Sequence, residues 1–202
     1  MASKLSQDIM KTQKIAIFAS GSGTNAENIA EYFSGSPEKA VTLILSNNKN
    51  AGVFGRAERL NIPSVLFSKD EFYQSQNVLD ILKQEKIDLI VLAGFLWLIP
   101  DYLISNFSGK IINIHPALLP KYGGKGMFGM KVHESVLYNK ESESGITIHF
   151  VNEKYDDGEV ILQVRCNVDP DDTPESLANK IHALEYEFFP KAIDKLLADP
   201  GA

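Results

Sequence analysis

The chain has 202 residues, of which 44% are hydrophobic and 23% charged, as in an ordinary globular protein with one sizeable domain. Lys and Arg number 20 against 26 Asp and Glu, and the net charge of −6 disfavours a nucleic acid as partner. The single cysteine, Cys166, excludes an internal disulfide and a cysteine metal cluster, and no apolar run approaches the ~20 residues of a membrane span. We therefore expect a cytoplasmic protein with neither a nucleic acid nor a membrane as partner.

Residues 1–13 lack the apolar core of a secretory signal and are predicted to be a flexible polar lead-in to one domain, residues 14–202. The first part of this domain alternates short apolar runs with stretches of helical spacing. We predict strands at residues 14–20, 40–46, 62–67, 89–95 and 110–116, and helices after Asn25, at 53–60, at 71–86 and after Pro100. This alternation predicts an α/β fold with a doubly wound, mostly parallel sheet, in which ligands bind beyond the carboxyl ends of the strands.

The last part of the chain has a different pattern. Residues 121–130 are glycine-rich and are predicted to form a mobile loop before a helix at 133–139. Residues 145–151 alternate, and a second run at 160–164 follows Asp156-Asp157-Gly158, which predicts a β-hairpin added to the sheet or standing beside it. Thr173 and Pro174 suit the N-cap and first position of a final helix that runs to Pro190 or on to Leu197.

A glycine-rich turn, Ser20-Gly21-Ser22-Gly23-Thr24-Asn25, joins the first strand to the first helix. The free amides at the start of that helix, with the positive end of its dipole, suit an anion such as phosphate. The turn lacks the third glycine of a dinucleotide fingerprint and the lysine of a P-loop. Glycines required by the turn geometry alone would explain it equally well.

Asn113 and His115 are a polar pair at the exit of an apolar strand, just before Pro116. Because they are two residues apart, their side chains share one face of the strand. A carboxamide and an imidazole in this position are a candidate catalytic pair. Asp156 is either a turn residue or the carboxylate that orients His115 and raises its pKa.

The other histidines give weaker signals. For His149, in the alternating strand, a hydrogen-bonded structural role is favoured. His133 and His182 lie in predicted helices, and His182 shares a face with Glu185, as a surface pair or as part of a site. The chain has neither the histidine and cysteine spacing of a metal site nor a Gly-x-Ser-x-Gly nucleophile elbow.

Three segments together resemble a known family: Asn113-x-His115-Pro116-x-Leu118-Leu119-Pro120, Leu92-Ala93-Gly94-Phe95 ahead of it, and Thr147-Ile148-His149-Phe150-Val151 followed by an Asp-containing loop. They resemble the 10-formyltetrahydrofolate-dependent formyltransferases. The turn at Ser20 is similar to the phosphate loop of the members that act on glycinamide ribonucleotide in purine biosynthesis. The resemblance implies a Rossmann-like formyltransferase fold and transfer of the formyl group of 10-formyltetrahydrofolate to the nucleotide's amine, through a tetrahedral intermediate.

The resemblance also implies the site residues. The catalytic trio would be Asn113, His115 and Asp156. The nucleotide would contact Gly23, Thr24, Asn25, His182, Ala183, Leu184 and Glu185. The folate would contact Leu92, Phe95, Leu96, Trp97, Leu98, Ile99, Asn113, Val151, Asn152, Glu153, Lys154, Tyr155 and Asp156. It implies small-molecule substrates, no metal, and a monomer or homodimer.

The proposed chemistry suits these side chains. Attack of an amine on the formyl carbon builds negative charge on the formyl oxygen, which a protonated imidazole and a carboxamide N–H would stabilise. Asp156 would accept the proton that the amine loses. The alternatives are a formyltetrahydrofolate hydrolase and a non-catalytic folate- or nucleotide-binding module. A methionyl-tRNA formyltransferase would be expected to carry a further domain and a basic surface.

Overall fold

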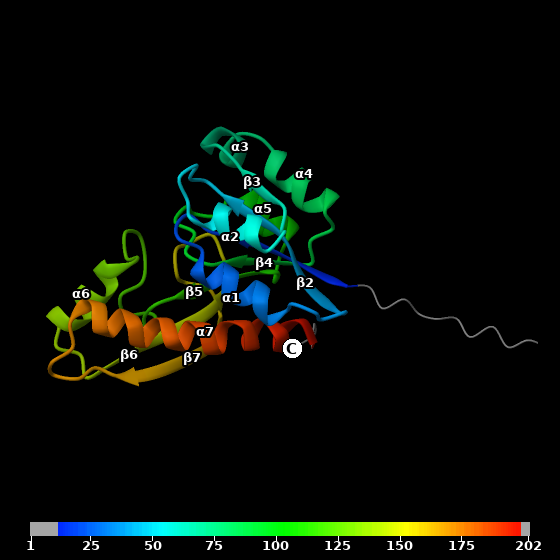
Figure 1. Cartoon of the computed structure of the whole chain (residues 1–202). Helices are drawn as coiled ribbons and strands as arrows, with labels where there is room; N and C mark the ends of the chain where they lie inside the picture. Colours follow the sequence, from blue (N-terminus) through cyan, green and yellow to red (C-terminus); the bar gives the residue numbers. More distant parts are fainter. Residues whose placement is uncertain (1–11, 199–202) are drawn as a thin grey trace, which may run out of the picture.

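The computed structural model describes residues 12–198, so that residues 1–11 of the predicted lead-in lie outside the described residues. Seven strands form one sheet in the order β3-β2-β1-β4-β5-β6-β7 (Figure 1). Their bounds are β1 Gln13–Phe18, β2 Lys39–Ser46, β3 Ser64–Leu66, β4 Leu89–Leu92, β5 Ile111–His115, β6 Glu143–Phe150 and β7 Val160–Asn167. The first strand therefore begins at Gln13, one residue earlier than expected.

The first five strands pair in parallel, and β6 and β7 continue the sheet antiparallel to their neighbours. The predicted hairpin is thus added to the sheet, next to β5. The pairing of β5 with β6 places Asn113 opposite His149 and His115 opposite Thr147. Side chains directly opposite each other on antiparallel strands lie on the same face, so this register brings two polar pairs together.

Helices cover both faces of the sheet, as the predicted doubly wound fold requires (Figure 1). Their bounds are α1 Thr24–Tyr32, α2 Val53–Arg59, α3 Lys69–Tyr73, α4 Asn77–Gln84, α5 Asp101–Asn106, α6 Met130–Tyr138 and α7 Pro174–Ala198. Buried side chains of α1, α2, α6 and α7 form one core with Ile15 and Ile17 of β1. Those of α3, α4 and α5 form a second core with Ala16 and Phe18, which alternate to the other face.

Some predicted boundaries were wrong. The helix predicted at residues 71–86 is two helices, α3 and α4, separated at Ser75. The Ser75 hydroxyl donates to the carbonyl of Glu71 at 3.0 Å and accepts from the amide of Asn77 at 3.3 Å, a local pattern that ends one helix and starts the next. The predicted strand 89–95 ends at Leu92, because the chain turns at Gly94 with φ of +72°.

The strand order sets the place of a ligand site. The chain leaves β1 for β2 and β3 on one side and returns to β4 on the other, so that the carboxyl ends of β1 and β4 flank a switch point in the sheet. The glycine-rich turn follows β1, and Asn113 and His115 end β5, one strand beyond β4. None of the helices in the described part of the chain is both long and apolar enough to cross a membrane.

Candidate active site

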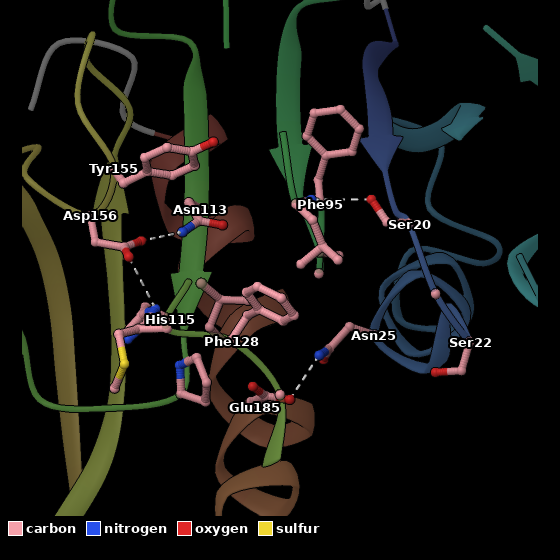
Figure 2. A pocket seen from close by; sticks show the side chains of 18 of the residues that line it. Ser20, Ser22, Asn25, Phe95, Asn113, His115, Phe128, Tyr155, Asp156 and Glu185 are labelled. Atoms are coloured by element: carbon pink, nitrogen blue, oxygen red, sulfur yellow. Dashed lines mark hydrogen bonds and ion pairs between the residues drawn. The ribbon is translucent and has the colours of Figure 1, made fainter. Parts of the chain in front are cut away.

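A cavity of about 610 Å³ opens at the carboxyl ends of β1, β4 and β5, in the size range of small-molecule sites (Figure 2). Its wall contains the turn from Ser20 to Asn25, residues 93–96 directly after β4, and Asn113 and His115 of β5. Residues from later segments complete it: Gly124–Gly129, His133, Tyr155, Asp156, His182 and Glu185. The segments that follow β1 and β4 and the end of β5 therefore meet at one edge of the sheet, beyond the carboxyl ends of the strands, where a ligand was expected to bind.

Helix α2 braces the glycine-rich turn from behind. The amide of Val53 donates to the carbonyl of Gly21 at 3.2 Å, and Nε of Arg56 donates to the carbonyl of Ser22 at 2.8 Å. In a trans peptide the N–H points opposite to the C=O, so the amides of Ser22 and Gly23 are directed away from α2. Both residues line the cavity. The brace therefore presents two backbone donors to an anion, beside the free amides at the start of α1.

The nucleotide end of the predicted site joins the start of α1 to α7. Nδ2 of Asn25 donates to Oε2 of Glu185 at 2.8 Å, and the two side chains face each other across the cavity (Figure 2). Burial raises the pKa of Glu185, while the hydrogen bond from Asn25 opposes the shift. Oδ1 of Asn25 is buried and has no hydrogen-bond partner in the described part of the chain. The arrangement leaves an acceptor free for a ligand.

Asn113 and His115 converge on Asp156. Nδ2 of Asn113 lies 3.4 Å from Oδ1 of Asp156, and Nδ1 of His115 lies 3.5 Å from Oδ2 (Figure 2). Both contacts are longer than the ~2.7–2.9 Å of a tight charge-assisted hydrogen bond. The amide of Gly124 also donates to Oδ2 of Asp156, at 2.8 Å. The structure thus brings the predicted trio together, with two side-chain donors and one backbone donor directed at one carboxylate.

Asp156 is set in place by an unusual backbone. Its φ is +54°, a left-handed backbone conformation that residues other than glycine rarely adopt. Gly158, two residues on, has no room for a side chain, because a Cβ there would lie 1.7 Å from the carbonyl oxygen of Phe150. Burial alone would raise the pKa of Asp156, but the neighbouring His149, the charge of His115 and the amide of Gly124 outweigh burial and lower it. The carboxyl is therefore ionised near neutral pH.

The expected rise in the pKa of His115 was wrong in its net direction. Burial is the largest effect and lowers the pKa, while Asp156 and the carbonyl of Tyr122 raise it as expected. Nε2 of His115 lies 2.7 Å from the carbonyl oxygen of Tyr122, so an acceptor flanks each ring nitrogen. Only the imidazolium can donate to both, and this geometry, rather than solvation, favours protonation.

His149 contacts the trio, which the sequence did not indicate. It is fully buried, and its Nε2 lies 3.1 Å from Nδ2 of Asn113 and 3.7 Å from Oδ1 of Asp156. Its Nδ1 is 2.7 Å from the carbonyl oxygen of Phe150, so Nδ1 carries the hydrogen and Nε2 accepts from Asn113. The hydrogen-bonded role predicted for His149 is correct, but its contacts include two members of the trio, Asn113 and Asp156.

A second histidine was missed. His133 of α6 lines the cavity and is only 3% exposed. The helix that carries it begins at Met130 rather than at the predicted residue 133. The segment before it, residues 124–129, forms part of the cavity wall, and Figure 2 shows Phe128 between His115 and Asn25. No periodic pattern identifies such a residue, because a buried histidine occupies an apolar helix position.

The predicted folate contacts fall into two groups. Phe95, Leu96, Tyr155, Asn113 and Asp156 line the cavity. The remaining eight lie outside its wall: Leu92, Trp97, Leu98, Ile99, Val151, Asn152, Glu153 and Lys154. Of these, Leu92 and Ile99 are core residues, and Trp97 belongs to an aromatic cluster with Phe95 and Phe72 at ring-centroid distances of 6.3 and 5.8 Å. Trp97 thus packs against Phe95, which lines the apolar end of the cavity.

The predicted nucleotide contacts divide in the same way. Gly23, Thr24, Asn25, His182 and Glu185 line the cavity, whereas Ala183 and Leu184 do not. Ala183 is exposed, and Leu184 packs against the core beneath α7. Successive residues of a helix point in different directions, so a four-residue stretch cannot all face one cavity. Within residues 12–198 there is no cluster of three His, Cys, Asp or Glu side chains that could hold a metal ion.

Comparison with known proteins defines the class. Residues 13–193 match the formyl transferase family model, and the chain belongs to this family. It is 35% identical over 190 residues to a phosphoribosylglycinamide formyltransferase of Bacillus subtilis, covering 92% of this chain and 95% of that protein. The structure of glycinamide ribonucleotide transformylase 1 from Geobacillus kaustophilus matches with a TM-score of 0.83 and 36% identity, covering 93% of this chain and all of that one.

Plant relatives are longer than this chain. The chloroplastic phosphoribosylglycinamide formyltransferase of Arabidopsis thaliana is 40% identical over 189 residues, which are 91% of this chain and 65% of that protein. The corresponding protein of Vigna unguiculata is 38% identical over 195 residues, 94% of this chain and 62% of that protein. The chain therefore spans less than two thirds of these relatives.

Proposed function

We propose that the chain transfers the formyl group of 10-formyltetrahydrofolate to the amine of glycinamide ribonucleotide, a step of purine biosynthesis. The observation that carries the proposal is a single cavity that joins a braced anion-binding turn at one end to Asn113, His115 and Asp156. Family membership and relatives named for this activity support it. Glycinamide ribonucleotide carries both the phosphate that the turn would bind and the amine that reacts. The bound nucleotide would therefore extend from the turn to the trio.

The turn would hold the nucleotide phosphate. The amides of Ser22 and Gly23 and the first amides of α1 supply donors, and the helix dipole adds a positive field. Glu185 and Asn25 would bind polar groups further along the nucleotide, near the amine. His182, on the same helix as Glu185, would complete this end of the site.

The folate would occupy the other end of the cavity. Phe95, Leu96 and Tyr155 give it apolar and aromatic walls, which suit a flat heteroaromatic ring. Asn113 and Asp156 lie where this end meets the nucleotide end, so the formyl carbon and the amine would come together beside them. The residues present therefore fit a reduced folate as co-substrate.

The trio would act by exchanging hydrogen-bond partners. As the amine attacks, negative charge grows on the formyl oxygen, which competes with Asp156 for Nδ2 of Asn113 and Nδ1 of His115. Asp156 keeps the amide of Gly124, so it stays in position while its basicity rises. It then accepts the amine proton and gives it to folate N10 as the tetrahedral intermediate collapses with cleavage of the bond from the formyl carbon to N10, which leaves Asp156 ionised again.

We further propose a cytoplasmic protein whose partners are these small molecules, as a monomer or homodimer. The net charge of −6 and the single cysteine support this setting.

The direct test is an assay with the purified chain. Tetrahydrofolate should be released from 10-formyltetrahydrofolate only when glycinamide ribonucleotide is present, in equal amounts with the formylated nucleotide. Release without nucleotide would identify a hydrolase instead. Binding of both compounds by calorimetry with no turnover would identify a non-catalytic module. The unphosphorylated nucleoside serves as a control, because it should be a poor substrate if the turn binds phosphate.

The brace behind the turn gives a second prediction, for Arg56→Ala. The KM for the nucleotide should rise about tenfold with little change in kcat, because one hydrogen bond that orients the turn is lost. Arg59→Ala is the matched control. Arg59 shares the partner Glu27 with Arg56 but donates to Gly55 of its own helix rather than to the turn. Equal effects of the two variants on KM would mean that the hydrogen bond from Arg56 to the turn does not contribute to nucleotide binding.

A further inference from the structure

His133 is a buried side chain with one ring nitrogen that makes no hydrogen bond within the described part of the chain. Its Nδ1 is shielded from solvent and has no hydrogen-bond partner among the described residues. The other two buried histidines, His115 and His149, each have a partner at both ring nitrogens. A buried donor or acceptor left unpaired destabilises a fold, so an apolar residue would be the more stable choice at this position.

The place of His133 indicates what it could bind. It lines the cavity, and both His115 and His182 are near enough to influence its charge. His115 belongs to the trio and His182 to the nucleotide end of the site. His133 therefore lies near both the reacting centre and α7. Oδ1 of Asn25, the other unpaired buried atom that a cavity residue contributes, also belongs to the nucleotide end.

We propose that Nδ1 of His133 forms a hydrogen bond with an uncharged group in the middle of the nucleotide substrate, a ribose hydroxyl or the glycinamide amide. This inference rests on the proposed function and assigns one further substrate-binding residue. Burial and the two neighbouring histidines lower the pKa of His133 to about 4, so the ring is neutral near neutral pH. A neutral imidazole suits a hydroxyl or an amide better than a phosphate, which the turn already accommodates.

The test compares His133→Leu, which keeps similar bulk, with His133→Asn, whose amide places a polar atom near the position of Nδ1. We expect His133→Leu to weaken nucleotide binding about tenfold by calorimetry, with unchanged folate affinity and an unchanged or higher melting temperature. His133→Asn should recover binding to within about threefold of the original protein. A histidine with a merely structural role gives the opposite pattern: a lower melting temperature, and losses that affect both ligands alike.

Substrate analogues identify the partner group. If a ribose hydroxyl is the partner, the corresponding deoxyribosyl analogue should bind the original protein more weakly and bind His133→Leu no worse than the full nucleotide does. If each hydroxyl deletion adds to the effect of the substitution, the amide is the partner. Unchanged nucleotide affinity in His133→Leu overturns the inference. Because binding is measured directly, this result is separable from an absence of transferase activity.

Discussion

Asp156→Asn is expected to lower kcat by about 10²–10⁴-fold, the range for loss of a general base. Asparagine keeps the size of the side chain and one acceptor oxygen, so the contact with the amide of Gly124 can persist. It removes the negative charge that faces Nδ1 of His115 and the atom proposed to accept the amine proton. Turnover should be measured with both substrates saturating, so that a change in binding does not enter.

Asp157→Asn is the matched control for this prediction. Asp157 is the next residue, is exposed, and forms an ion pair with Lys154 rather than with the trio. Its replacement removes the same charge from the same loop and should leave kcat within about twofold, because exposed ion pairs contribute little. If Asp156→Asn retains near-normal kcat while folded by circular dichroism, the carboxylate has no part in the chemistry. Similar losses in both variants would point to a disturbed loop instead.

The alternation of the first five strands with helices was predictable, because each strand is a short apolar run and four of the five are followed by glycine, asparagine or proline. Local rules of this kind need no knowledge of distant contacts. The prediction of one continuous helix at residues 71–86 was wrong, and the cause is also a local interaction. Phe72, Leu79 and Leu82 fit one helical stripe, but Ser75 bonds to the backbone and ends the first helix. Periodicity reports which residues are buried and does not report a break between two short helices.

The candidate site was predictable only where a residue is unusual for its element. Asn113 and His115 stand out on an apolar strand, whereas His149 is ordinary on a strand that alternates. Its role depends on the register that sets it opposite Asn113, which only the folded sheet defines. The pKa of His115 shows a related limit. The chain order suggests Asp156 as a partner, but the larger effect is burial, which depends on everything packed around the ring.

Gly23→Ala is expected to weaken nucleotide binding by about a hundredfold or more. Gly23 has φ of +76°, and a Cβ there would lie 2.4 Å from Cγ2 and 2.8 Å from Cα of Val53. The second atom belongs to the backbone of α2, so no rotation of a side chain relieves the overlap. The turn and α2 must separate, and the hydrogen bonds that fix the Gly21 and Ser22 carbonyls are lost with the orientation of the amides. The left-handed conformation alone costs alanine about 1–2 kcal/mol, so a fall of several degrees in melting temperature should accompany the loss.

Gly21→Ala separates this effect from a general intolerance of the turn. A Cβ at Gly21 would meet no atom within 4 Å, and its φ lies outside the left-handed region. Nucleotide affinity by calorimetry should therefore stay within about threefold of that of the original protein, and the melting temperature should be unchanged. Equal losses in the two variants would mean that phosphate binding needs glycine for close approach along the whole turn. Equal tolerance would mean that the contact between the turn and α2 does not hold the amides in place, and the proposed phosphate site would lose its structural basis.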